Sequence, residues 1–470
     1  MSGTLSRFRI EALHNRHTID VRIEDNKLSL VGENGTGKST VANFIYFFLT
    51  RQWHRMLNYG FKAVVAVIDS VRIEVTQEDL VKSRDSDRLL RRLPPSLRSQ
   101  FLDLMSTHSI EYFLQNREET YRYARQLELP LTIVSDYIEH FSESEEARLL
   151  SEKLEHAKQS LEALITDQVL YLPTYRRVEQ DLGSIVPELA SSSEFKASME
   201  RWKRRAQSSS YIELVQFGMQ DVEETIKRKM KELGDSWRDD LSKLTGTYLR
   251  DVIQGAYQHA EPSEIIELDE ATINAIFNRI DQTVLPEPEQ KRLRAIVAKI
   301  KVDHHIQSDE KVIVHFLTRL IELHTTQQEK EKDVREFIEV CNEYLSGKGL
   351  IYDNMSFEIS IKQRSVVGQD EKEGKSEAIK MSMLSSGEKQ IVSLFSQIYL
   401  AAGSSYFVII DEPELSLSVF WQKRFLPDIL ESGRCSGLIA VTHSPFIFEN
   451  QLDSYAHSLE QFMEPADAFH

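Results

Sequence analysis

The stretch Gly32-Glu33-Asn34-Gly35-Thr36-Gly37-Lys38-Ser39 decides the fold of this chain. It matches the pattern G-x-x-x-x-G-K-[ST], and it lies between an apolar run at residues 27–31 and an amphipathic run at residues 41–49. The pattern is specific for a phosphate-binding loop when a strand precedes it and a helix follows it. The sequence therefore predicts a nucleotide-binding α/β domain that begins near the N-terminus.

The residues of this phosphate loop (residues 32–39) predict how a triphosphate is held. Backbone N–H groups of a glycine-rich loop point at phosphate oxygens, and the following helix adds the partial positive charge of its N-terminus. Lys38 is expected to reach the β- and γ-phosphates, Ser39 to bind Mg²⁺ through its hydroxyl, and Thr40 to contact the region of the α-phosphate. The expected ATP-binding set is Asn34, Gly35, Thr36, Gly37, Lys38, Ser39 and Thr40.

A second motif, Phe407-Val408-Ile409-Ile410-Asp411-Glu412-Pro413-Glu414, supplies carboxylates. Its four apolar residues predict a buried strand, and carboxylates at the end of such a strand need a cation or protons to offset their desolvation. Asp411 is therefore predicted to orient Mg²⁺, and Glu412 to be the catalytic base that polarises the attacking water. His443, which ends the next apolar strand, is predicted to contact the γ-phosphate.

The segment Leu384-Ser385-Ser386-Gly387-Glu388, the signature segment, precedes an amphipathic helix. Ser385 and the N–H groups after it would lie at the N-terminus of that helix, which is an anion-binding geometry. The segment resembles the signature loop that caps a nucleotide bound on a second copy of an ABC-type ATPase. The resemblance implies that Ser385, Ser386, Gly387 and Glu388 bind the ATP of a neighbouring copy, so that ATP reports assembly.

Composition excludes several classes of protein. The 470 residues are 41% hydrophobic, and no apolar run approaches the roughly 20 residues that span a bilayer. The N-terminus also lacks the layout of a signal peptide, so we expect a cytoplasmic protein with no membrane partner. The two cysteines, Cys341 and Cys435, lack the spacing of a zinc site and do not form a disulfide framework.

Charge bears on nucleic-acid binding. The formal net charge of −17 disfavours a surface that tracks phosphate backbones over its whole extent. Two local basic clusters are either solvated helix faces or contacts for phosphates or a partner, and direct DNA binding is left open. These clusters are Arg88, Arg91, Arg92 and Arg98, and Arg201, Lys203, Arg204 and Arg205.

Patterns of hydrophobicity predict an α/β fold whose N-terminal and C-terminal pieces form one head, with helical material inserted between them. Together with the motifs, which resemble those of ABC-type ATPases, this implies a split ABC-type ATPase head with an inserted helical or short coiled-coil region. Glycines at positions 234, 246 and 255 predict a short, imperfect helical hairpin in the insertion, and a compact helical lobe is the alternative. The expected parts are an N-terminal ATPase lobe (1–77), a helical insertion (78–166), a core strand with a Q-loop-like segment (167–182), a helical hairpin or assembly arm (183–346) and a C-terminal ATPase lobe (347–470).

Related ATPases place a glutamine that bridges the metal and the attacking water in a loop after this core strand. Which residue takes that role here stays open, and Arg176 or Arg177 either contacts a phosphate or pairs with a nearby acid. The candidates after Leu172 are Thr174, Tyr175, Arg176, Arg177 and Gln180.

Together the motifs resemble the ABC-ATPase class that includes SMC, RecF and overcoming-lysogenisation-defect proteins, over residues 5–77, 168–182 and 347–455. In this class the loop at residues 415–418 senses the other head and commonly ends in Asp in transporters, where this chain has Ser418. The strings at residues 170–177, 411–418 and 442–448 are more particular. They resemble ATPase subunits of bacterial antiphage systems, first the AriA subunits of PARIS and second the PtuA subunits of Septu.

This resemblance implies a sensor and scaffold. The ATPase would assemble as a homodimer or higher multimer and restrain or activate a separate toprim-like nuclease, similar to AriB, in response to a phage trigger protein. The sequence ends about 25 residues after His443, too few for a nuclease domain of its own. The alternative is an SMC- or RecF-like ATPase that clamps DNA directly. A transporter's ATPase subunit fits less well, because of the helical insertions.

Overall fold

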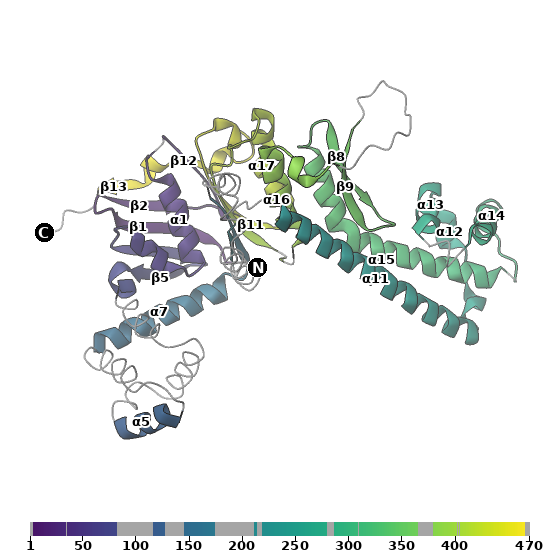
Figure 1. Ribbon diagram of the computed structural model, residues 1–470, viewed down its shortest axis with the longest axis horizontal. Coiled ribbons are helices and arrows are strands. Elements are labelled where there is room, and N and C mark those ends of the chain that lie inside the picture. Colours follow the sequence, from purple (N-terminus) through teal and green to yellow (C-terminus); the bar gives the residue numbers. More distant parts are fainter. Residues whose placement is uncertain are drawn as a thin grey trace, which may run out of the picture. The chain divides into compact units, whose positions relative to one another are not determined.

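The computed structural model of the protein describes residues 3–33, 35–81, 116–126, 145–173, 211–213, 219–279, 286–308, 310–364, 379–401, 403 and 405–465. The chain divides into two compact units (Figure 1). Unit 1 comprises residues 1–215 and 403–470, and unit 2 comprises residues 216–402. The part boundaries expected from the sequence stay predictions. Both basic clusters and the candidates for the bridging glutamine lie outside the described residues.

An antiparallel sheet of five strands forms one half of unit 1, in the order β13-β2-β1-β4-β5. β4 and β5 form a hairpin that turns at Asp69-Ser70, and both turn residues have positive φ angles, as tight hairpin turns require. The last strand, β13, pairs with β2 and so joins C-terminal residues to the N-terminal sheet. The bounds are Leu5–Leu13 (β1), His17–Arg22 (β2), Ala63–Ile68 (β4), Val71–Thr76 (β5) and Met463–Pro465 (β13).

A parallel sheet of six strands forms the other half, in the order β12-β3-β11-β10-β6-β7. Its strands come from the start, the middle and the end of the sequence, so the sheet forms only when these pieces meet. The predicted split α/β fold is therefore confirmed. The bounds are Lys27–Val31 (β3), Gln168–Leu172 (β6), Tyr211–Glu213 (β7), Tyr406–Asp411 (β10), Cys435–Thr442 (β11) and Ala456–Ser458 (β12).

Helix α1 (Lys38–Leu49) packs between the two sheets and is buried on nearly all sides. Phe48 meets Phe8 of the antiparallel sheet edge-on, with 5.6 Å between ring centroids, and Tyr46 stacks at 4.4 Å on Tyr171 of the parallel sheet. The core of unit 1 thus fixes the helix that follows the phosphate loop. The other helices of this unit are α5 (Arg117–Gln126), α7 (Glu145–Leu164), α17 (Val419–Glu431) and the short turns η1 (Trp53–Asn58), η4 (Pro445–Ile447), η5 (Asp453–Tyr455) and η6 (Leu459–Phe462).

Unit 2 is built on an antiparallel pair of long helices, α11 (Gln220–Ile253) and α15 (Lys311–Asn342). The sequence suggested that glycines interrupt the first helix, but α11 runs unbroken through Gly234 and Gly246 and ends before Gly255. A glycine inside a helix costs about 1 kcal/mol, and packing outweighs that cost here. With 34 residues, α11 is about 50 Å long.

Smaller elements complete unit 2. The turn η2 and the helices α12, α13 and α14 lie between the long helices in sequence, and the helices share an apolar core with α15. The hairpin β8–β9 and helix α16 follow α15, and α16 packs against α11 and α15. The bounds are Ala256–His259 (η2), Ser263–Glu267 (α12), Glu270–Arg279 (α13), Glu287–Asp303 (α14), Lys348–Asp353 (β8), Glu358–Gln363 (β9), Met381–Met383 (η3) and Ser386–Leu400 (α16). Among the described residues, no helix has the length and apolarity that a bilayer crossing needs.

A buried ion pair stabilises the middle of unit 2. The side chain of Arg279 is 1% exposed and donates to Glu331, which is 0% exposed. Glu331 also accepts from Arg335 at 3.0 Å, and the Arg279 guanidinium lies 5.3 Å from the ring centroid of Trp237 on α11. α13, α15 and α11 all contribute to this cluster, and loss of Glu331 would leave the buried charge of Arg279 without its carboxylate.

We expect Glu331→Ala to destabilise the protein by about 3–5 kcal/mol, because it leaves Arg279 buried without its carboxylate. Urea unfolding followed by circular dichroism measures the change. Glu287→Ala is the matched control, since Glu287 pairs with Lys291 at the surface, where both side chains are mostly exposed. Equal denaturation midpoints for the two variants would show that the buried ion pair does not hold unit 2 together.

Candidate functional site

Two glycines shape the phosphate loop between β3 and α1. Gly35 and Gly37 have φ angles of 83° and 99°, in the left-handed region where other residues are strained. Gly37 is the N-cap of α1, so the N–H groups of the first helical turn have no acceptor four residues earlier. They are directed toward the loop, where an anion would lie. Asn34, also predicted to bind phosphate, lies outside the described residues.

Lys38 is held inside the phosphate loop. Its ammonium donates to the backbone oxygens of Gly32 at 2.8 Å and Glu33 at 2.6 Å, and the residue is 4% exposed. Burial lowers the pKa of Lys38 below its usual value, while the carboxylates of Asp411, Glu412 and Glu414 oppose this shift. The loop thus positions a buried cation beside the carboxylates at the end of β10 and just after it.

The hydroxyl of Ser39 donates to Oδ1 of Asp411 at 3.0 Å, although 372 positions separate the two residues in sequence. Asp411 is the last residue of β10 and is 3% exposed. Hydroxyl and carboxylate oxygens are ligands that Mg²⁺ binds in proteins, together with phosphate oxygens and waters. The pair therefore fits the predicted metal position.

Glu412 has a strained backbone. Its φ angle is 51°, which is uncommon for a residue with a side chain, and two hydrogen bonds hold it there. The Glu412 N–H donates to Val441 of β11 at 2.8 Å, and its carbonyl accepts from Leu415 at 3.2 Å. The carboxylate is partly exposed, with Oε1 3.8 Å from Nε2 of His443. The structure thus brings together the carboxylate and the imidazole that the sequence singled out.

Glu414 belongs to this site as well, although the sequence motifs assigned it no role. Its carboxylate accepts from the hydroxyl of Thr442 at 2.8 Å and from the backbone N–H of His443 at 2.7 Å. Glu414 therefore fixes the end of β11 and the position of His443. The only sequence signal is an acid two residues after Glu412.

A second chain of hydrogen bonds links this loop to the segment after β10. Ser444 donates to Oε1 of Gln422 at 2.6 Å, and Nε2 of Gln422 donates to the carbonyl of Leu417 at 2.9 Å. Ser418 caps α17 by accepting from the N–H of Trp421 at 3.4 Å. Ser418, which stands where transporters commonly have Asp, therefore has a hydrogen-bond partner in the first turn of α17.

The signature segment lies in unit 2, where it starts α16. Ser385 is the N-cap: its hydroxyl accepts from the N–H of Glu388 at 3.4 Å, and its own N–H donates to the Glu388 carboxylate at 2.8 Å. The N–H groups of Ser386 and Gly387 belong to the first turn and have no acceptor within the helix. The segment thus has the anion-binding geometry that the sequence predicted.

Residues 5–448 match the AAA ATPase domain family. The chain belongs to this family. The match extends from the antiparallel sheet through the phosphate loop to the residues after His443, and membership makes the protein an ATPase. No curated protein matches the chain.

Two solved structures align with this AAA ATPase. One is the Smc head domain with an extended coiled coil bound to the C-terminal domain of ScpA from Pyrococcus furiosus, with 11% identity, a TM-score of 0.32, and 95% of this chain and 91% of that chain covered. The other is the Smc head domain with a coiled coil and joint from Pyrococcus yayanosii, with 14% identity, a TM-score of 0.29, and 95% and 93% covered.

A cavity of about 770 Å³ adjoins the phosphate loop of this AAA ATPase. Gly35 and Thr40 form one side, the turn between β1 and β2 contributes His14, and the first residue of β2 contributes His17. Glu460 and Met463 come from the C-terminal residues that β13 brings to β2. No sequence pattern indicated this cavity, because Glu460 and Met463 reach it through that strand pairing.

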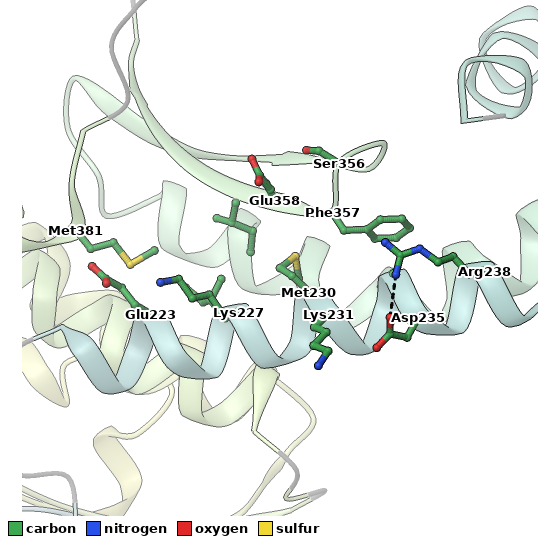
Figure 2. A pocket seen from close by; sticks show the side chains of 13 residues that line it. Glu223, Lys227, Met230, Lys231, Asp235, Arg238, Ser356, Phe357, Glu358 and Met381 are labelled. Carbon is green, nitrogen blue, oxygen red and sulfur yellow. Dashed lines mark hydrogen bonds and ion pairs between the residues drawn. The ribbon is translucent and has the colours of Figure 1, made fainter. Parts of the chain in front are cut away.

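Unit 2 holds a second cavity, of about 470 Å³, along one side of α11 (Figure 2). Ile226 and Met230 line it from the helix, and Phe357 from the turn between β8 and β9. Its charged lining balances, so it lacks the positive charge that selects phosphate. The charged residues are Glu223, Asp235 and Glu358, and Lys227, Lys231 and Arg238.

We expect Glu414→Gln to lower ATP turnover by roughly tenfold, since it replaces one acceptor of a pair of charge-assisted hydrogen bonds and so displaces His443. Steady-state phosphate release measures turnover, and equilibrium binding of a fluorescent ATP analogue should stay at the wild-type level. The control is Glu449→Gln, because Glu449 is an exposed acid a few residues after His443. Equal turnover in the two variants would show that Glu414 does not position the site.

Proposed function

We propose that this ATPase binds ATP at the phosphate loop, together with Mg²⁺, and hydrolyses it. The observation that carries this proposal is the convergence of Lys38, Ser39, Asp411, Glu412 and His443 at one edge of the parallel sheet. Backbone N–H groups of the loop and of the first turn of α1 would bind the phosphate oxygens. Lys38 would exchange its contacts with loop carbonyls for the β- and γ-phosphates.

Ser39 and Asp411 are the residues that would hold Mg²⁺. When bound, the ion would neutralise charge on the phosphates. Glu412 would orient the attacking water and accept its proton at Oε1 or Oε2, and His443 would contact the γ-phosphate. The short distance between their side chains supports this division of roles.

The cavity beside the phosphate loop would receive the nucleoside. It adjoins Thr40, expected near the α-phosphate, and its volume of about 770 Å³ exceeds what a base and a ribose require. Leu13 and Met463 offer apolar contacts for the base, and Glu460 offers an acceptor for a ribose hydroxyl or an amino group. These side chains would set the preference among nucleotides.

The signature segment would complete the site of a second copy. The hydroxyl of Ser385 accepts from the N–H of Glu388 and would turn its own proton toward a phosphate oxygen. The N–H groups of Ser386 and Gly387 supply two more donors at a helix N-terminus. ATP would then hold two subunits together, and hydrolysis would release them.

The biological role that we propose is an antiphage sensor and scaffold. The multimer would restrain or activate a separate toprim-like nuclease until a phage protein is sensed, as the resemblance of residues 170–177, 411–418 and 442–448 to such ATPase subunits suggests. The net charge of −17 also favours a protein partner over a DNA duplex.

A second candidate is an ATPase that clamps DNA directly, as the SMC-like resemblance suggests. The long pair formed by α11 and α15 favours it, because such a hairpin can span the width of a duplex. The two candidates share the ATP site and differ in the partner.

Glu412→Gln should bind ATP normally but turn it over about 100- to 10,000-fold more slowly, because the general base is lost. In the presence of ATP, associated subunits of this variant should then accumulate, which size-exclusion chromatography with light scattering detects. Ser385→Arg in the Glu412→Gln protein should abolish that association and leave ATP binding by single subunits intact.

Lys38→Ala is the control for this experiment, since it should bind no ATP and form no associated species. Wild-type turnover by Glu412→Gln would refute the choice of base. Association that survives Ser385→Arg would refute the shared site.

Partner preference separates the two candidate roles. Because a DNA clamp releases counterions on binding, it should bind duplex DNA with an affinity that falls steeply between about 50 and 200 mM salt. The sensor should instead co-purify with the nuclease encoded beside it and show weak DNA binding. Tight, salt-dependent DNA binding without a nuclease partner would overturn the sensor proposal.

A further inference from the structure

The signature segment carries a charge that opposes its proposed task. Glu388 is 5% exposed, and its carboxylate lies in the first turn of α16 beside the N–H groups of Ser386 and Gly387. A carboxylate at that place stabilises the helix by capping Ser385, yet it would also repel a triphosphate. The segment can bind an anion only if the negative charge of Glu388 is neutralised.

Lys348 of β8 supplies the balance. Its ammonium lies 2.9 Å from Oε2 of Glu388, the same oxygen that accepts the N–H of Ser385. Burial raises the pKa of Glu388, but the hydrogen bonds from Lys348 and Ser385 outweigh burial, and the pKa is lowered overall. Glu388 is therefore ionised, and Lys348 both neutralises it and fixes its orientation.

The long helices set the position of Lys348. Asn342, the last residue of α15, holds β8 with two hydrogen bonds to Leu350, 2.7 Å to its N–H and 3.0 Å to its carbonyl. The turn of the same hairpin rests on α11, where the ring of Phe357 packs over Gly234 (Figure 2). The hairpin that carries Lys348 is thus held by both helices.

We propose that Lys348 is a positioning residue for the signature segment, which neutralises Glu388 and couples the order of Ser385 to the helices α11 and α15. The inference rests on the proposed role of Ser385 in binding the ATP of a second copy. Lys348 does not touch the nucleotide. It acts through Glu388 on the hydroxyl and the N–H groups that would.

Lys348→Gln tests the proposal in the full chain. Turnover should fall by roughly tenfold or more, because a charge-assisted hydrogen bond is lost and a buried carboxylate is left unpaired. ATP-driven association should weaken with it, while ATP binding by single subunits stays unchanged. Hydrogen exchange at Ser385–Glu388 amides should become faster. Lys348→Arg should restore all three properties, and Lys362→Gln, an exposed lysine on β9, is the matched control.

A double-mutant cycle isolates the charge. In a Glu388→Gln background, which keeps a capping side chain but removes the charge, Lys348→Gln should change turnover no further. Two outcomes would contradict the proposal even if Lys348→Gln alone were poorly folded. The first is a Lys348→Arg protein that matches the control Lys362→Gln in hydrogen exchange but has lower ATP turnover. The second is a cycle in which the losses of turnover from Lys348→Gln and Glu388→Gln are additive. Normal turnover by Lys348→Gln would overturn it directly.

These outcomes separate the positioning role from the proposed function. If Ser385→Arg lowers turnover but Lys348→Gln does not, the shared ATP site stands and the positioning role falls. If Ser385→Arg has no effect, the shared site itself falls.

Discussion

Parallel strands end at the same edge of a sheet, and the ATPase site depends on this constraint. β3, β11 and β10 are neighbours in unit 1, so the phosphate loop, His443 and Asp411 leave the sheet side by side. These segments are far apart in the sequence, and only the sheet brings them within hydrogen-bond distance. Helix α1, packed between both sheets, then fixes the loop relative to the strands.

Charge is the second constraint at this edge. One buried ammonium, that of Lys38, faces the carboxylates of Asp411, Glu412 and Glu414. Hydrogen bonds organise two of these carboxylates, since Ser39 donates to Asp411, and Thr442 and His443 donate to Glu414. The excess negative charge explains why we propose a divalent cation for binding a triphosphate. At the signature segment, Lys348 lies beside Glu388 and neutralises the negative charge of its carboxylate.

Local motifs predicted the fold class and most of the candidate site. The glycine loop, the apolar strand that ends in Asp411 and the helix that begins after Ser385 each depend on a few consecutive residues, so their structures follow from the sequence. The contact of Glu414 with His443, the cavity between His17 and Met463, and the Lys348 contact depend on tertiary pairing. α11 also shows that packing can carry a helix through Gly234, where propensity alone predicts a break.

The central claim is that each ATP is shared by two copies of the chain. Mixing Lys38→Ala subunits with Ser385→Arg subunits tests it most directly, because each variant alone lacks one half of every shared site. In a mixed pair, the intact phosphate loop of one subunit meets the intact signature segment of the other. The account predicts that the mixture regains ATP turnover which neither variant has alone, and a mixture that stays inactive at every ratio would contradict it.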